Sequence, residues 1–160
     1  MAPREVERFF ADSNALPPVT VSAALALVDD AQLRLEEREG VVVAEPSPFA
    51  EMFREAFARR GARMHPLVAP QAAADDARVQ AASLVIVAAG VPGVVDARRL
   101  AAGAIAIDVG YFNPAARGDI ANVDAARHVG AVVPVPGGIG PMTISALLER
   151  VIRFAERDSA

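Results

Sequence analysis

The chain has neither cysteine nor lysine among its 160 residues. Without cysteine it can form no disulfides or thiolate metal sites, and it has no cysteine nucleophile. Without lysine it lacks the side chain used by P-loops, Schiff-base enzymes and lysine general bases, and all 16 of its basic residues are arginine. No uncharged apolar run reaches the length of a membrane-spanning helix. These absences exclude several classes of enzyme and indicate a protein with no membrane partner.

The remaining composition is that of one packed globular domain. Hydrophobic residues make up 53% of the chain, and the mean hydropathy is +0.30. A chain of this length buries roughly 70% of its unfolded surface. The net charge of −4 argues against a nucleic-acid partner, because such proteins usually present a basic face. The amino-terminal residues are too highly charged for a signal peptide, so we expect a cytoplasmic protein.

Short β-branched runs alternate with helical stretches along the chain. We expect strands at 41–43, 84–87, 105–109 and 131–133, a weaker strand at 62–67, and helices at 4–10, 21–36 (capped by Thr20 or Ser22), 49–60, 72–81 and 123–129. Strands that are apolar throughout are buried on both faces, and their alternation with helices is typical of parallel βαβ units. The pattern predicts a Rossmann-like, doubly wound α/β domain with a three-layer αβα arrangement at 16–160, after a helical extension at 1–15.

The run from Pro134 to Thr143 is the most distinctive part of the chain. It contains three glycines and three prolines, which give a loop with unusual backbone angles and few N–H donors. An apolar stripe follows at helical spacing and predicts a half-buried helix, formed by Ile144, Leu147, Leu148, Val151, Ile152 and Ala155. Loops of this kind in a parallel sheet lie over the carboxyl ends of the strands, where ligands bind. A tight connection without a ligand is the alternative interpretation.

The loop after the first strand differs from a dinucleotide-binding turn. A pyrophosphate normally meets glycines and free backbone amides at the start of a helix. This loop reads Ala44-Glu45-Pro46-Ser47, with no glycine, a proline that lacks an N–H, and a carboxylate. A carboxylate about 4 Å from a phosphate costs about 1–4 kcal/mol. Pyrophosphate binding in the usual pose is therefore unfavourable here, and we expect Ser47 to cap the next helix.

The loop after the second strand has no acid for the 2′-hydroxyl of the NAD ribose. Arg63 and His65 could instead meet a 2′-phosphate, although Arg63 is equally typical of a solvated edge position. The other histidine, His128, falls in an expected surface helix. Neither histidine has a metal-ligand partner at helical spacing, so we predict no metal site.

The third and fourth strands are followed by further candidate residues. Gly90 and Gly93 bracket a turn that can bring the backbone close to a ligand. Asp108 ends the fourth strand, where it either binds a ligand or caps neighbouring backbone amides. Tyr111, which follows, could flank a ring.

The segment 136–143, Pro-Gly-Gly-Ile-Gly-Pro-Met-Thr, closely resembles the Pro-Gly-Gly-Val-Gly-Pro-Met-Thr signature of the methylenetetrahydrofolate dehydrogenase/cyclohydrolase family. Residues 87–94, 107–110 and Gly118-Asp119 are similar to further motifs of that family, and the resemblance covers about residues 16–157, its cofactor-binding half. The resemblance implies NADP or NAD as cofactor, oxidation of methylenetetrahydrofolate, hydrolysis of the methenyl product, and a homodimer. The candidate cofactor-binding residues are Ala44, Glu45, Pro46, Ser47, His65, Gly90, Pro92, Asp108, Gly110, Tyr111, Pro136, Gly137, Gly138, Gly140 and Thr143.

The chain also departs from the family pattern. The family's folate half, with its catalytic tyrosine and lysine, normally precedes this region, whereas about fifteen residues precede Leu16 here. The family's Gly-Arg-Ser loop falls on Ala44 to Ser47, where the glycine and the arginine are replaced. No catalytic residue can be carried over. We therefore expect either a truncated relative that acts with a folate-domain partner chain, or a non-catalytic binding or regulatory module with a degenerate NAD(P) site; we do not expect unaided turnover.

Overall fold

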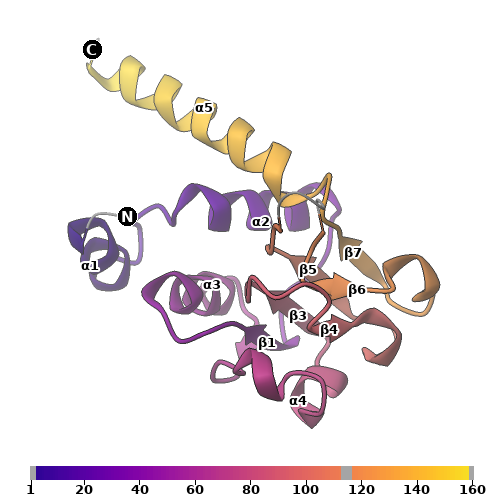
Figure 1. Cartoon of the computed structure of the whole chain (residues 1–160). Coiled ribbons are helices and arrows are strands. Elements are labelled where there is room, and N and C mark those ends of the chain that lie inside the picture. Colours follow the sequence, from indigo (N-terminus) through magenta and orange to yellow (C-terminus); the bar gives the residue numbers. More distant parts are fainter. Residues whose placement is uncertain (1–2, 113–116, 159–160) are drawn as a thin grey trace.

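A five-stranded parallel sheet forms the centre of the computed structural model, which describes residues 3–112 and 117–158 (Figure 1). The strand order is β2-β1-β3-β5-β7. The strands are β1 (Glu39–Val43), β2 (Arg63–Met64), β3 (Leu84–Val87), β5 (Ile105–Asp108) and β7 (Ala131–Val133). A separate parallel pair joins β4 (Val95–Asp96) to β6 (Ile120–Ala121). The predicted Rossmann-like α/β fold is confirmed.

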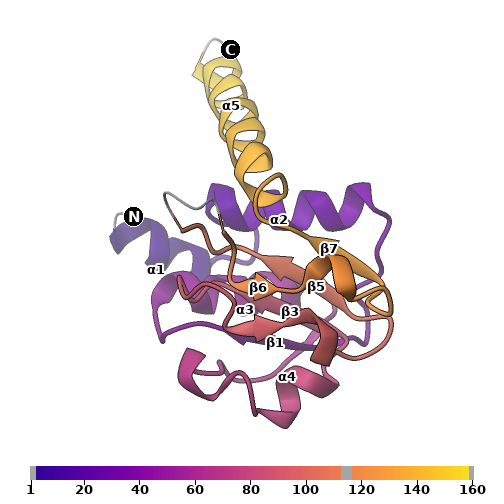
Figure 2. The same ribbon diagram turned by 45° about the vertical axis from the view of Figure 1, so that its right-hand side comes forward.

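Helices cover both faces of the sheet, as Figure 2 shows from a second side. One face carries α1 (Pro3–Ala11), α2 (Val19–Asp30), α3 (Pro48–Arg59) and α5 (Ile139–Asp158). The other carries α4 (Ala77–Ala81) with the short 3₁₀ turns Pro70–Ala72 and Ala97–Arg99, and a third turn lies at Val123–Ala125. Neighbouring strand residues point to opposite faces, so Val42 packs under the long helices while Val41 packs on the α4 side.

Three of the predicted helices differ in length from those in the structure. The helix expected at 21–36 starts at Val19, after Pro18, and ends at Asp30, because Gln32 takes a positive φ angle of 53° that turns the chain. Thr20 and Ser22 therefore lie inside this helix, and neither caps it. The segment expected as a helix at 72–81 forms the short helix α4, after the turn Pro70–Ala72. The segment expected at 123–129 forms only the turn Val123–Ala125.

The amino-terminal helix α1 packs on the core through Phe9, which is almost fully buried. Arg59 of α3 holds this contact, since its Nη2 donates to the Phe9 carbonyl at 2.8 Å. Its guanidinium carbon also lies 4.4 Å from the centre of the Phe9 ring, within cation–π range. One arginine thus joins α1 to α3.

The last helix, α5, crosses α2 and then projects away from the body of the protein (Figures 1 and 2). Met142, Ala146 and Arg150 are partly buried on one side of this helix, and Nη2 of Arg150 donates to the Pro17 carbonyl at 2.6 Å. The prediction that its apolar stripe is half-buried is wrong for this structure. Ile144, Leu147, Leu148, Val151 and Ile152 are each between 50% and 63% exposed, because α5 is rotated so that another face meets α2.

Within the described ranges, no helix combines the length and apolarity needed to span a membrane.

Candidate functional site

The candidate site lies along one edge of the sheet, where the carboxyl ends of the parallel strands meet. The register places Val43 beside Val87, and Val87 beside Asp108, while Ile107 pairs with Val133. The loops that begin after these strands are therefore neighbours at one edge. They carry most of the predicted cofactor-binding residues, at positions 44–47, 90–92, 108–111 and 136–140.

Asp108 is the buried centre of this edge and is only 1% exposed. Its Oδ1 accepts hydrogen bonds from the backbone N–H groups of Gly110 and Asp119, both at 3.0 Å. Its Oδ2 accepts one from Ile120 at 2.8 Å. Burial raises the pKa of Asp108 to about 6. Of the two roles open from sequence, the structure shows the capping of backbone amides.

A second buried carboxylate, Asp119, extends this network to the loop after β3. Its Oδ2 accepts from the N–H groups of Ala89 at 2.7 Å and Gly90 at 2.8 Å. Burial raises the pKa of this carboxyl as well. A side chain at Gly118 would collide with the Asp108 carboxylate, and one at Gly110 with that of Asp119. The two aspartates thus fix the loops after β3 and β5 relative to each other.

Polar groups of the loop after β1 make hydrogen bonds to other parts of the protein. The Ala44 N–H donates to the Val68 carbonyl at 3.1 Å, and Ser47 Oγ accepts from the Ala50 N–H at 3.1 Å. The predicted cap by Ser47 is therefore confirmed. Glu45 presents an exposed carboxylate that accepts from Gln71 Nε2 at 2.9 Å. These residues do not fit a pyrophosphate cradle, because the loop offers negative charge and a proline where the diphosphate needs amides.

His65 is not brought to this edge, and the Thr143 hydroxyl is used within its own helix. His65 Nε2 lies 2.9 Å from Glu39 Oε2 at the amino end of β1, and Arg63 Nε lies 2.7 Å from the other Glu39 oxygen. The Thr143 hydroxyl donates within α5 to the Ile139 carbonyl at 2.8 Å. His65 lies near the amino end of β1 because β2 pairs only with the first residues of β1.

The chain reaches the carboxyl edge beyond β2, at Val68, which forms a bridge with Val43. Gln71, which holds Glu45, follows from this position and was not foreseen from sequence. Asp119 was also absent from the candidate residues, although the Gly118-Asp119 pair was the signal that could have identified it. Its role depends on contacts with residues about thirty positions earlier in the chain.

The glycine-rich loop between β7 and α5 follows the last strand of the sheet at this carboxyl edge. Its Val135–Pro136 peptide is cis, and Gly137 has a φ of 106°, which favours glycine. Gly138 donates its N–H to the Pro134 carbonyl at 2.9 Å and is too close to Val133 for a side chain. Side chains built at Gly137 or Gly140 would meet no described atom within 4 Å. The loop is therefore tightly held at Gly138 and open at its outer surface.

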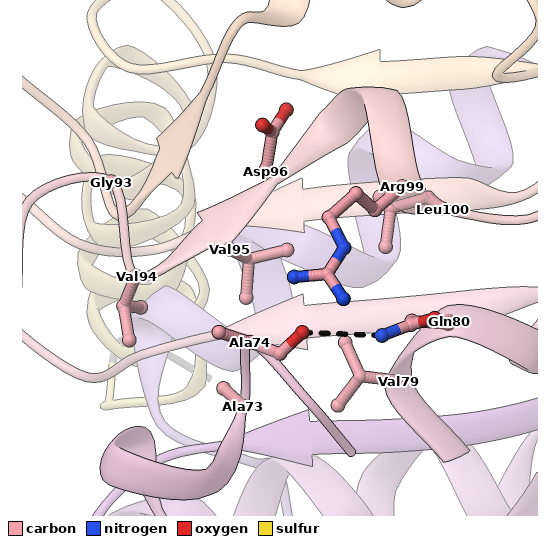
Figure 3. Close-up of a pocket in the computed structure, with 10 residues that line it drawn as sticks. All are labelled: Ala73, Ala74, Val79, Gln80, Gly93, Val94, Val95, Asp96, Arg99 and Leu100. Atoms are coloured by element: carbon pink, nitrogen blue, oxygen red, sulfur yellow. Dashed lines mark hydrogen bonds between the residues drawn. The ribbon is translucent and has the colours of Figure 1, made fainter. Parts of the chain in front are cut away.

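A small cavity of about 90 Å³ lies beside α4 and the β4 segment (Figure 3). The Arg99 side chain lies between Val95 and Gln80, and Gln80 Nε2 donates to the Ala74 carbonyl at 3.1 Å. Typical ligand pockets measure about 300–1,000 Å³. The cavity is too small for a dinucleotide or a folate. Within the described part of the chain, no group of three acidic or histidine side chains is placed to hold a metal ion.

An all-parallel sheet with shaped loops at its carboxyl edge defines a domain of the nucleotide-binding, Rossmann-like class. Residues 18–159 match the family described as "Tetrahydrofolate dehydrogenase/cyclohydrolase, NAD(P)-binding domain". The chain belongs to this family, and the family resemblance predicted from sequence is confirmed.

Individual relatives agree with the family match. The Bifunctional protein FolD of Shouchella clausii is 33% identical over 141 residues, covering 88% of this chain and 50% of that protein. Bifunctional protein FolD 1 of Saccharopolyspora erythraea is 31% identical over 160 residues, covering 97% of this chain and 54% of its own length. This chain thus spans about half the length of the curated relatives it matches.

Solved structures show the same fold. Methylenetetrahydrofolate dehydrogenase-cyclohydrolase (FolD) of Trypanosoma brucei, complexed with NADP and an inhibitor, superposes with a TM-score of 0.84 at 26% identity. The match covers 99% of this chain and 57% of that one. The bifunctional enzyme of Thermoplasma acidophilum gives a TM-score of 0.80 at 26% identity, with coverage of 99% and 57%.

Proposed function

We propose that this chain provides the NAD(P)-domain half of a methylenetetrahydrofolate dehydrogenase/cyclohydrolase of one-carbon metabolism, while another polypeptide supplies the folate site. The observation that carries this proposal is the family's own loop, Pro136 to Thr143, held at the carboxyl edge of a complete Rossmann-like sheet. The aspartate network keeps the neighbouring loops in place, so one wall of a shared cleft is preformed. The cleft would be completed by the partner polypeptide.

A second candidate function is a non-catalytic binding or regulatory module with a degenerate NAD(P) site. The loop after β1 favours it, because Glu45 and Pro46 stand where a pyrophosphate would need free amides. The absence of lysine also leaves this chain without a lysine acid or base. In this alternative the fold and the cleft are retained, but affinity for the cofactor is lost.

A thermal-shift titration of the purified chain with NADP and NAD separates the two candidates. A ligand at one hundred times its Kd stabilises a protein by about 2.7 kcal/mol. For a domain of this size, that corresponds to a rise in Tm of roughly 5–10 °C. The partnered half-enzyme should show this shift at submillimolar cofactor. The binding module should show none at millimolar cofactor.

The loop after β1 can be tested directly with a double substitution, Glu45→Arg together with Pro46→Ser. It removes the negative charge and restores one backbone N–H, so NADP should bind more tightly by at least tenfold. Glu36→Arg is the matched control, because it makes the same charge change at an exposed position before the amino end of β1. If the double variant binds NADP no better than the control, this loop is not what limits affinity.

A cytoplasmic location and a homodimer belong to the same proposal. The lack of cysteine suits a reducing compartment but does not require one. The edge strands β2 and β7 are only two and three residues long, so a sheet-edge dimer would need further contacts. Analytical ultracentrifugation of the isolated chain across a hundredfold range of concentration measures the oligomeric state.

A further inference from the structure

The cavity beside α4 combines apolar walls with two polar side chains whose heads point toward each other (Figure 3). These polar groups are the guanidinium of Arg99 and the amide of Gln80. The apolar walls come from side chains that are almost fully buried: Ala73, Val79, Val95 and Leu100. Ligand pockets are usually built in this way, from mostly apolar walls and a few polar groups that fix the orientation of the ligand.

Arg99 has donors to spare for a ligand. Its Nη2 lies 3.6 Å from Asp75 Oδ1, which is too far for a hydrogen bond. Its side chain donates no hydrogen bond to any residue in the described part of the chain. Two neighbouring arginines differ, because each is held by an aspartate two positions earlier with Nη2 at 2.6 Å from Oδ2: the pairs are Asp76–Arg78 and Asp96–Arg98.

The acidic groups near Arg99 leave room for an anion. The Asp75 side chain is 93% exposed, so its weak ion pair with Arg99 can be displaced at little cost. Asp96 also lines the cavity, but Figure 3 shows its carboxylate pointing away from the Arg99 guanidinium. The hydrogen-bonded Arg98 holds the pKa of Asp96 well below its usual range, so this carboxylate stays ionised and paired. Arg99 is therefore the cation that faces the cavity.

The volume of the cavity limits the ligand to a few atoms. An apolar cavity of about 150 Å³ in a protein core binds benzene. In proportion, the volume of about 90 Å³ holds about four non-hydrogen atoms, which is the size of formate or acetate. A planar carboxylate also matches the fork of N–H donors on a guanidinium. Size and charge thus point to the same class of ligand.

The cavity adjoins the loop that borders the candidate site. Gly93 and Val94 line the cavity and belong to the loop after β3. In the same loop, the Gly90 N–H donates to Asp119 Oδ2 at 2.8 Å at the carboxyl edge of the sheet. A ligand in the cavity would contact this loop from the side opposite the long helices.

We propose that this cavity is a binding site for a small monocarboxylate, formate or acetate, whose carboxylate is held by the Arg99 guanidinium and the Gln80 amide. The site lies apart from the loop after β1 and does not depend on the proposed function.

An NMR titration of the ¹⁵N-labelled full chain with sodium formate and sodium acetate tests the site, with sodium chloride keeping the ionic strength constant. The amide signals of Gly93, Val94 and the Gln80 side chain should shift and saturate, with a Kd of about 1–10 mM for a ligand of this size. Benzoate, which is larger than the cavity, should give no saturable shift.

Four substitutions connect binding to the residues of the cavity. Arg99→Gln should weaken acetate binding by at least tenfold, and Gln80→Leu by about threefold, because each removes donors to the carboxylate. Asp75→Asn should strengthen binding by about twofold, because it removes the competing charge. Arg34→Gln is the control, since it removes the same charge at an exposed position before β1 and should leave the Kd within about twofold. The exchanged side chains are partly or fully exposed, so every variant should fold like the parent chain.

Three results would overturn the proposal. One is the lack of a saturable shift with either formate or acetate up to about 100 mM. Another is equal acetate affinity of the parent chain and Arg99→Gln. The third is a response to benzoate or to chloride alone that equals the response to acetate, because the cavity would then select neither by size nor by the carboxylate group.

Discussion

Replacing Asp108 by asparagine should change how the stability of this protein depends on pH. Asp108 is buried, and its pKa of about 6 lies above the value of 3.8 that the carboxyl has when exposed. Between these two values the folded protein binds more protons than the unfolded chain. The Asp108 contribution therefore makes the folded state less stable as the pH rises from about 4 to 6.

The size of this effect follows from the two pKa values. A shift of one unit corresponds to 1.36 kcal/mol, so full ionisation costs the folded state about 3 kcal/mol, of which about 2 kcal/mol falls between pH 4.5 and 7.5. Asparagine does not titrate, and its amide occupies nearly the same volume. The free energy of unfolding of Asp108→Asn, relative to that of the parent chain, should therefore increase by about 2 kcal/mol from pH 4.5 to pH 7.5.

Urea unfolding of both proteins at pH 4.5 and 7.5 measures this difference. Asp124→Asn, at an exposed position in the turn before β7, is the control. Its free energy of unfolding should depend on pH in the same way as that of the parent chain. The opposite result, in which the free energy of unfolding of the parent chain increases relative to that of Asp108→Asn as the pH rises, would contradict this expectation. That result would mean that the three backbone hydrogen bonds to the carboxylate outweigh the cost of burying its charge.

Substitutions at three further positions test the structure by urea unfolding, and the one at Arg59 is also tested by hydrogen exchange. Gly118→Ala should destabilise the protein by about 2–4 kcal/mol, because its methyl group would displace the Asp108 carboxylate; a change below 1 kcal/mol would contradict the close packing. Ser47→Ala should cost about 1 kcal/mol by removing the cap of α3, and Ser47→Asp should restore most of it. Arg59→Lys should cost about 1–2 kcal/mol and speed hydrogen exchange in α1, because lysine cannot both stack on Phe9 and hold its carbonyl; unchanged exchange would show that α1 is held otherwise.

The strands and the cap of α3 could be predicted from sequence because their signals are local. The strand at Leu84–Val87 is apolar throughout, and Ser47 precedes a proline at the start of a helix, so neighbouring residues alone specify both. The length of the second helix could not be predicted in the same way. Its end depends on the positive φ angle of Gln32, a conformation that residues other than glycine adopt only in a particular context.

The structure brings predicted site residues to one edge where the chain itself sets their position. The loop at 136–140 follows its strand directly, and the register of β5 and β7 brings it to the ligand edge. His65 lies away from that edge because the position of β2 along β1 decides which residues reach it, and local sequence signals do not specify that register.

The amino-acid sequence by itself determined the fold class, the family and the unusual chemistry of the loop after β1, because hydrophobic periodicity and local motifs carry that information. Tertiary structure alone decided that Asp108 and Asp119 hold the loops after β3 and β5 together, and that α5 turns its apolar stripe away from the core. The reason is that periodicity specifies which helix face is apolar, whereas the packing of α5 on α2 decides which face is covered.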